Sequence, residues 1–198
     1  MRMTPAALRL LLCVSMLSSA ACAARYSASP GSTTIAPGLE FAIPSGRDLG
    51  HSLDATQLIT AHFHDQVQVF QAYISVSPEK ITVIALDPFG SRAMTITATD
   101  DGIHSEVAPM VPSVLRPANI LADIAIVYWP APALRRGLAG TSATLSDNES
   151  ERTISVDGRE VVHVSYPAPH EDSWTKFARL RNIAYGYELD LQSTVTEK

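Results

Sequence analysis

The sequence predicts an α+β fold, in which helices cover a strongly curved antiparallel half-barrel sheet and enclose an apolar cavity. Short segments rich in β-branched residues, separated by turn residues, fill residues 56–107 and 153–195. This pattern is typical of antiparallel strands. Residues 117–138 instead have the period of helices. Several strands are apolar on both faces, as expected where helices lie across a curved sheet over an apolar pocket.

The N-terminus has the pattern of a bacterial export signal, predicted to span residues 1–21. Two arginines precede the apolar run Leu10–Leu17, and small residues then lead to Cys22. The run is too short to cross a bilayer, which takes about 20 apolar residues. We expect cleavage before Cys22 and lipid attachment to its thiol. The alternative is cleavage after Ala23 or Ala24, which would give a soluble periplasmic protein.

Residues 22–50 are predicted to form the lipidated N-terminus and a flexible tether, and residues 51–198 the folded domain. Gly, Pro, Ser and Thr crowd the tether, as in flexible linkers. Only Leu39, Phe41 and Ile43 alternate there, which predicts one short edge strand. No intrachain disulfide is expected, because Cys22 is the one thiol left after the signal.

The first strands of the domain are predicted at residues 56–64 and 67–76, with a tight turn at Asp65-Gln66 between them. The next two, Ile81–Leu86 and Ala93–Thr99, form the central hairpin of the chain.

The loop of that central hairpin is Asp87-Pro88-Phe89-Gly90-Ser91. Pro88 fixes its own φ, and Gly90 can take the positive φ that such a loop needs. Phe89 is unusual, because loop tips normally face water. Either the ring folds back onto its own sheet, or it is an apolar finger that enters a membrane or another protein.

A helix is predicted from Pro117 to Trp129, where apolar residues recur on one face and Pro130 ends the element. A second, short helix follows over residues 131–138. The tail returns to strands, with an Asp157-Gly158 hairpin turn. A short strand is predicted before the helices, at residues 103–107. The strands of the tail are predicted at residues 153–156, 161–166, 174–181 and 185–195.

Catalytic and metal-binding patterns are weak. His62 and His64 share one face of a strand, but no third ligand lies at a usable spacing, so no metal site is predicted. The sequence has no Gly-x-Ser-x-Gly elbow and no phosphate-binding glycine loop. A net charge of −5 argues against nucleic acid as a partner. We expect no enzyme and no cofactor; a hydrolase that uses the His62/His64 region is the least favoured hypothesis.

Four short motifs occur in a characteristic order over about residues 50–195. They are Leu-Asp-Pro-Phe-Gly-Ser-Arg at 86–92, Ile-Leu-Ala-Asp-Ile at 120–124, Tyr-Trp-Pro at 128–130 and Gly-Tyr-Glu-Leu at 186–189. In these motifs the chain resembles the outer-membrane lipoprotein receptor family LolB. It is still more similar to a family of bacterial lipoproteins that share this fold and are often encoded beside aryl polyene or fatty-acid-type biosynthesis genes. The resemblance implies a LolA/LolB-like half-barrel over a hydrophobic cavity.

The resemblance also implies roles for single residues. LolB proteins carry an exposed leucine that enters the membrane where this chain has Phe89, so Pro88, Phe89 and Gly90 become the predicted membrane-inserting loop. If Cys22 is acylated, Ala23 follows it rather than the aspartate linked to inner-membrane retention, which favours the periplasmic face of the outer membrane. The predicted cavity walls are Phe70, Ile74, Val83, Met94, Ile96, Leu121, Ile124 and Trp129.

Two functional hypotheses follow from these observations. In the first, a lipid-anchored protein receives a hydrophobic ligand of acyl, lipoprotein or polyene type, from a periplasmic LolA-like carrier or an export complex, and assists its insertion into the outer membrane. In the second, the chain is a non-catalytic scaffold or binding partner of a periplasmic lipid export or biosynthesis complex.

Overall fold

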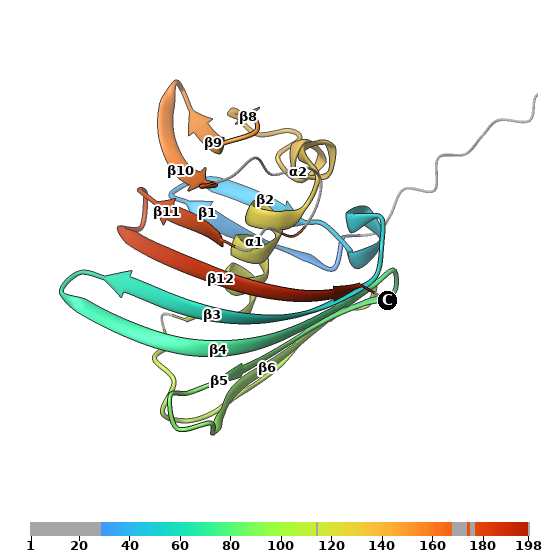
Figure 1. Ribbon diagram of the computed structural model, residues 1–198. Coiled ribbons are helices and arrows are strands. Elements are labelled where there is room, and N and C mark those ends of the chain that lie inside the picture. The colour runs from blue at the N-terminus through green and yellow to red at the C-terminus, as the bar shows by residue number, and fades with distance from the viewer. Residues whose placement is uncertain (1–28, 114, 168–173, 175–176, 198) are drawn as a thin grey trace, which may run out of the picture.

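The computed structural model describes residues 29–113, 115–167, 174 and 177–197. Ten strands form one antiparallel sheet in the order β7-β6-β5-β4-β3-β12-β11-β10-β9-β8, which is open because β7 and β8 are its two edges. The sheet curves around the helices α1 and α2 and a separate hairpin, β1-β2 (Figure 1). The α+β class with a curved antiparallel sheet is therefore confirmed. The predicted signal, Cys22 and the tether up to residue 28 lie outside the described residues.

The elements have the following bounds. The strands are β1 Gly31–Ala36, β2 Leu39–Ile43, β3 Leu53–Phe63, β4 Gln66–Ser77, β5 Lys80–Leu86, β6 Arg92–Thr99, β7 Gly102–Val107, β8 Ala143–Asp147, β9 Glu151–Val156, β10 Arg159–Ser165, β11 Phe177–Asn182 and β12 Tyr187–Glu197. The helices are a 3-10 turn η1 Gly46–Leu49, α1 Pro117–Tyr128 and α2 Ala131–Gly137.

Side chains of the central strands alternate between an inner face, which packs on the core, and an outer face. In β4, Ala72, Ile74 and Val76 are buried, whereas Tyr73 between them is exposed. Ile74 lies opposite the buried Val83 of β5. This period of two is the one on which the strand predictions depended, and it places the core on one side of the sheet.

The structure differs from the prediction that residues 22–50 form a flexible tether. Residues 31–49 form β1, β2 and η1, and Phe41 and Ile43 are fully buried against the rest of the core. Gly137 of α2 approaches this hairpin so closely that an added Cβ would lie 2.4 Å from the Ala42 carbonyl oxygen. The folded part of the chain therefore begins by Gly31 rather than at residue 51.

A buried arginine of β9 caps the C-terminal end of α1. Nη1 of Arg152 donates hydrogen bonds to the carbonyl oxygens of Ile126 and Trp129, at 2.7 and 2.9 Å. Its other nitrogens bind the Asp147 carboxylate at 2.8 and 3.2 Å. These contacts satisfy carbonyl groups that a helix end leaves without partners, so they connect α1 to the β8-β9 edge.

Smaller differences concern strand limits. Strand β8 was not predicted, and the strand expected to begin at Trp174 begins at Phe177. The β3-β4 turn lies one residue earlier than predicted, with His64 at a φ of 51°. Within the described part of the chain, no helix is long and apolar enough to cross a membrane.

Candidate functional site

The loop between β5 and β6, residues 87–91, is held by its first residue; we call it the tip loop. The Asp87 carboxylate accepts hydrogen bonds from the backbone N–H groups of Phe89 and Ser91, at 2.9 and 2.8 Å. The Gly90 N–H donates to the Asp87 carbonyl oxygen at 3.0 Å and closes a β-turn. Gly90 has a φ of 80°, where a residue with a side chain would be strained. The loop is therefore shaped before any partner arrives.

Phe89 projects from the tip loop into solvent and is 93 % exposed. The alternative in which the ring folds back onto its own sheet is wrong. Pro88 precedes it at the corner of the turn, where a fixed φ near −65° suits the backbone. Burying such a ring is worth about 1.5–3 kcal/mol to whatever covers it. Exposure is confirmed, and insertion into a membrane stays a prediction.

Other exposed apolar side chains lie at the same end of the sheet as the tip loop. Because the strands are antiparallel, the β3-β4 turn, the tip loop, the end of β7 and the β11-β12 turn all meet there. Met110, just after β7, is 71 % exposed. We call this end of the molecule the tip face, and its exposed apolar residues are Phe63, Val67, Phe89, Val107, Met110 and Ile183.

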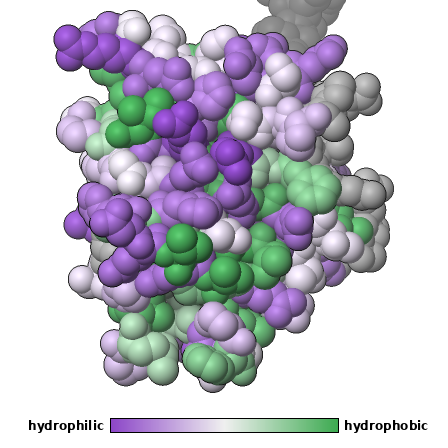
Figure 2. Space-filling model, turned by 60° about the vertical axis from the view of Figure 1, so that its left-hand side comes forward, coloured by the Kyte–Doolittle hydropathy of each residue, from purple (hydrophilic) through white to green (hydrophobic). Residues whose placement is uncertain are grey.

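The opposite end of the sheet is polar. Its β4-β5 turn exposes Glu79, and its β6-β7 turn carries Asp100 and Asp101. Among the described residues, the large exposed apolar side chains lie on the tip face or on the outer face of the sheet. Figure 2 turns the left-hand side of Figure 1 forward, and apolar surface gathers in the lower half of this view. The apolar exposure is therefore concentrated rather than scattered.

The residues predicted to line a cavity lie on the inner face of the sheet and on α1. Seven are buried within the hydrophobic core, and the eighth, Phe70, is half-buried. None of them lines either of the hollows described below. The buried residues are Ile74, Val83, Met94, Ile96, Leu121, Ile124 and Trp129.

Phe70 lies in the part of the inner face where the side chains are only half-buried. The tip loop starts beside it, because the preceding pair across β4 and β5 is Gln71 and Leu86. We call this region the inner shelf: the half-buried apolar side chains Ile59, Ala61, Phe70 and Leu189, which lie on β3, β4 and β12 next to the tip face.

A buried acid lies beside the inner shelf. The Tyr187 hydroxyl donates to the Asp123 carboxylate of α1, at 2.9 and 2.8 Å from its two oxygens. Although Asp123 as a whole is only half-buried, its carboxyl group is enclosed. Burial raises the pKa of Asp123 to about 7, and the hydrogen bond from Tyr187 opposes that rise. This carboxyl group therefore changes its protonation near neutral pH.

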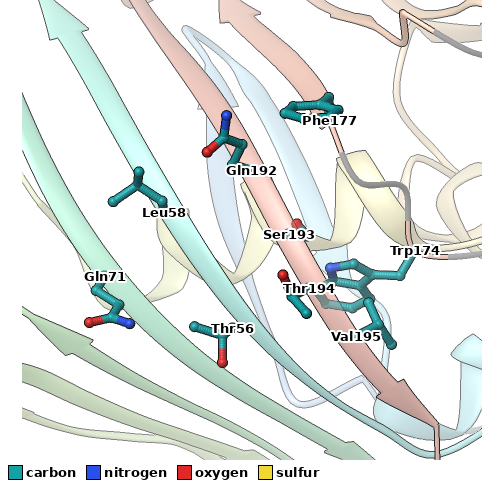
Figure 3. Close-up of a pocket in the computed structure, with 9 residues that line it drawn as sticks. All are labelled: Thr56, Leu58, Gln71, Trp174, Phe177, Gln192, Ser193, Thr194 and Val195. Atoms are coloured by element: carbon teal, nitrogen blue, oxygen red, sulfur yellow. The ribbon is translucent and has the colours of Figure 1, made fainter.

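Two hollows lie along strand β12. The larger has a volume of about 640 Å³ and lies beside Trp174 (Figure 3); the second has a volume of about 500 Å³. Both are lined by Leu58, Phe177 and Gln192. They are therefore neighbouring parts of one groove across β3, β12 and β11.

His62 is engaged in an ion-pair ladder rather than a metal cluster. Its Nε2 lies 3.3 Å from Oδ2 of Asp190, and Nε of Arg179 donates to the other oxygen at 2.6 Å. The Arg179 hydrogen bond is the main reason that the pKa of Asp190 lies below its usual range. Within the described residues, no group of three or more His, Cys, Asp or Glu side chains has metal-binding geometry.

Sequence comparison connects these features to a family. A family model described as "Protein of unknown function (DUF3261)" matches residues 54–195. The chain belongs to the DUF3261 family. No curated protein matches the sequence of this DUF3261 member. Among solved structures, it is similar to a LolA superfamily protein from Nitrosomonas europaea, with 10 % identity, a TM-score of 0.44 and coverage of 75 % of this chain and 86 % of the other. It is also similar to a DUF1329 family protein from Desulfovibrio piger, with 8 % identity, a TM-score of 0.43 and coverage of 77 % and 89 %.

Several residues of these sites in the DUF3261 chain were not predicted. Phe63 and Val67 flank the β3-β4 turn, Met110 follows β7 and Ile183 follows β11, so they join Phe89 only through the antiparallel topology. Met110 had one sequence signal, its position between Pro109 and Val111-Pro112 outside any periodic segment. The hollow beside Trp174 had no sequence signal.

Proposed function

We propose that this chain is a lipoprotein of the outer membrane, anchored through Cys22 on the periplasmic face, that receives a hydrophobic ligand and assists its insertion into the bilayer. The observation that carries the proposal is the tip loop, which presents an aromatic ring 93 % exposed on a backbone already fixed by Asp87. The ligand would be of acyl, lipoprotein or polyene type, delivered by a LolA-like carrier or an export complex.

Contact with the bilayer would be apolar and reversible. The chain has a net charge of −5, so anionic headgroups would not attract it. Insertion of Phe89 together with Met110 would contribute about 3–6 kcal/mol, taking about 1.5–3 kcal/mol for each side chain. This free energy suits a contact that forms and breaks, while acyl chains on Cys22 would keep the protein at the membrane.

The inner shelf supports ligand transfer at the same end. Its apolar side chains Phe70, Ile59 and Leu189 are half-buried and lie next to the tip loop. A hydrocarbon chain that leaves the bilayer beside Phe89 would meet this surface first. The buried residues beyond it, such as Met94 and Ile96, would line a cavity only if the core opened around the ligand.

The test is transfer of a fluorescent acylated peptide to liposomes by the chain carrying Cys22→Ser, which removes its own anchor. We expect Phe89→Glu to abolish transfer, because a carboxylate in place of the ring opposes entry into hydrocarbon. The matched control is Phe89→Leu, which keeps an apolar tip and should keep transfer. Since residue 89 is exposed, both variants should melt like the parent. Unaltered transfer by the Phe89→Glu protein would refute the proposal.

A second candidate, the scaffold or binding partner of a lipid export or biosynthesis complex, is favoured by the position of the N-terminus. Gly31 lies close to Ile103 at the start of β7, since a Cβ added to it would be 3.2 Å from the Ile103 side chain, whereas the tip face lies at the other end of that strand. Strand β6 has eight residues, about 25 Å of chain. The segment from Cys22 to Gly31 spans at most about 30 Å. A tether this short allows the tip face to point away from the anchoring membrane, toward a partner.

The two candidates differ in what Phe89 touches. A partner that is captured by the chain after delipidation, and lost in Phe89→Ala, would support the scaffold. Capture that disappears on delipidation, together with transfer that depends on Phe89, would support the membrane role.

A further inference from the structure

The hollow beside Trp174 spans strand β12 next to the start of β11: Leu58 and Gln192 line it from the outer face of the sheet, whereas Ser193 and Trp174 line it from the side of α1 (Figure 3). Its wall combines apolar side chains, Leu58, Phe177 and Val195, with the neutral polar groups of Ser193 and its neighbours. None of the described residues that line it is charged. A wall of this composition suits an uncharged ligand with both hydrocarbon and polar parts.

Trp174 supplies a buried hydrogen-bond donor for which the described residues provide no acceptor. Its indole stacks on the Tyr128 ring of α1, with the ring centroids 3.9 Å apart and the planes 4° from parallel. The residue is 8 % exposed, and among the described residues its Nε1 has no hydrogen-bond partner. In Figure 3 the indole nitrogen is on the side of the ring that faces Ser193. Leaving a buried N–H unpaired is costly, so a bound acceptor would remove a standing penalty.

A second donor adjoins the first. The Gln57 amide donates to the hydroxyl oxygens of Tyr128 and Ser193, at 2.7 and 3.0 Å. Those two oxygens are 3.0 Å apart, so one hydroxyl donates to the other. In this arrangement one hydroxyl proton is left over, and Gln57 Oε1 has no hydrogen-bond partner among the described residues. When Tyr128 donates, the Ser193 proton is free to turn toward the hollow, where Ser193 is part of the wall.

We propose that this hollow binds an uncharged long-chain acyl ester or amide. Its carbonyl oxygen, which has two lone pairs, would accept hydrogen bonds from the Trp174 N–H and the Ser193 hydroxyl. Its hydrocarbon chain would lie over Phe177 and Leu58, which also line the second hollow. The ion pair of Arg179 and Asp190 lines that hollow too, so the chain would keep to its apolar side, beside Pro167 and Leu191. The site is separate from the tip face, so it does not depend on membrane insertion by Phe89.

The experiment compares two glycerol amphiphiles that differ at one group, 1-monolauroylglycerol, an ester, and 1-O-dodecylglycerol, an ether that lacks the carbonyl. Binding to the Cys22→Ser chain is measured by calorimetry below the micelle concentration. One hydrogen bond to a neutral group changes affinity by about three- to tenfold. We therefore expect the ester to bind at least about threefold more tightly than the ether. Laurate, the charged analogue, should bind more weakly than the ester.

The location is tested by the indole N–H resonances, of which the chain has two, from Trp129 and Trp174. Addition of the ester should shift the Trp174 signal and leave that of Trp129 in place, since Trp129 already donates to the Ser45 carbonyl oxygen at 2.8 Å. Trp174→Phe keeps an aromatic ring for the stack on Tyr128 and should abolish the preference for ester over ether. Ser193→Ala should reduce that preference without altering the aromatic stack.

Three results would overturn the proposal: equal affinity for ester and ether in the parent chain, tighter binding of laurate, or no binding of any of the three. An ester preference that persists in both Trp174→Phe and Ser193→Ala, with unchanged melting temperatures, would place the carbonyl elsewhere and would also refute it.

Discussion

Replacing Arg152 with methionine tests whether the end of α1 depends on a cation held inside the fold. The change removes two hydrogen bonds to α1 carbonyl oxygens and leaves the Asp147 carboxylate without its bidentate partner. Breaking a buried ion pair from one side costs about 3–5 kcal/mol. For a domain of this size, each kcal/mol lowers the melting temperature by about 2–4 °C, so we expect a fall of roughly 6–20 °C.

The assay is thermal unfolding followed by circular dichroism, with two comparison variants. Arg159→Met removes an exposed arginine at the start of β10 and should shift the midpoint by no more than about 2 °C. Adding Asp147→Asn to Arg152→Met should recover part of the loss, because the charge that has lost its Arg152 partner is then removed. If Arg152→Met had the same melting temperature as Arg159→Met, this account of how the end of α1 is stabilised would be refuted.

Two further predictions concern the N-terminal hairpin and the buried acid. Phe41→Ala should destabilise the fold by about 3–5 kcal/mol in urea unfolding, because Phe41 is fully buried, whereas its exposed neighbour Glu40→Ala should have little effect. Equal stability of these two variants would show that the hairpin is part of a flexible tether and does not pack into the core. The Asp123 pKa of about 7 exceeds the ordinary aspartate value of 3.8, so the folded state binds the proton more strongly than the unfolded state. Stability should therefore be greatest below pH 4 for this group and should fall as pH rises to about 7, by about 1.4 kcal/mol per pKa unit at most. Asp123→Asn should flatten that slope, and an unchanged slope would show that the carboxyl is not buried as described.

The strands of the main sheet were largely predictable because one face of the sheet is buried. A buried face imposes a period of two, and β4, β5 and β6 show it clearly in sequence. The turn residues reinforced the pattern: Gly158 and Gly90 have positive φ in the hairpin turns predicted for them. The helix α1 was found for the equivalent reason, a period near 3.6 that starts at Pro117 and ends before Pro130.

Of the N-terminal hairpin only the strand at Leu39, Phe41 and Ile43 was predicted, because the composition of this segment and its environment disagree. Residues 31–49 are rich in Gly, Ser, Thr and Pro, which is typical of linkers, and local propensity dominated the prediction. In the structure, Ile35, Leu39 and Phe41 are buried against α1 and α2, so tertiary packing decides the outcome. Strand β8 was missed because its alternation is short and mostly polar, and only its pairing with β9 makes it a strand.

Some functional residues were likewise marked by a local sequence pattern, whereas others are brought together only by the fold. Phe89 stood out in sequence because an aromatic residue between Pro and Gly at a loop tip is unusual, and the structure places it in solvent. Its neighbours on the tip face come from turns far apart in the chain, so no local pattern could group them. Trp174 was assigned to a strand, and only the structure shows that its indole stacks on α1 and that its N–H has no partner within the described part of the chain.

The most direct test of the central claim is the depth of residue 89 in a bilayer. In the Cys22→Ser chain without residues 1–21, Phe89→Cys gives a single thiol for an environment-sensitive fluorophore. A matched label at Glu79→Cys reports the opposite end of β5. The account predicts that liposomes shift the emission at position 89 to the blue and that nitroxide-bearing lipids quench it, with neither effect at position 79. An unshifted, unquenched probe at position 89, in protein shown to be folded, would contradict it.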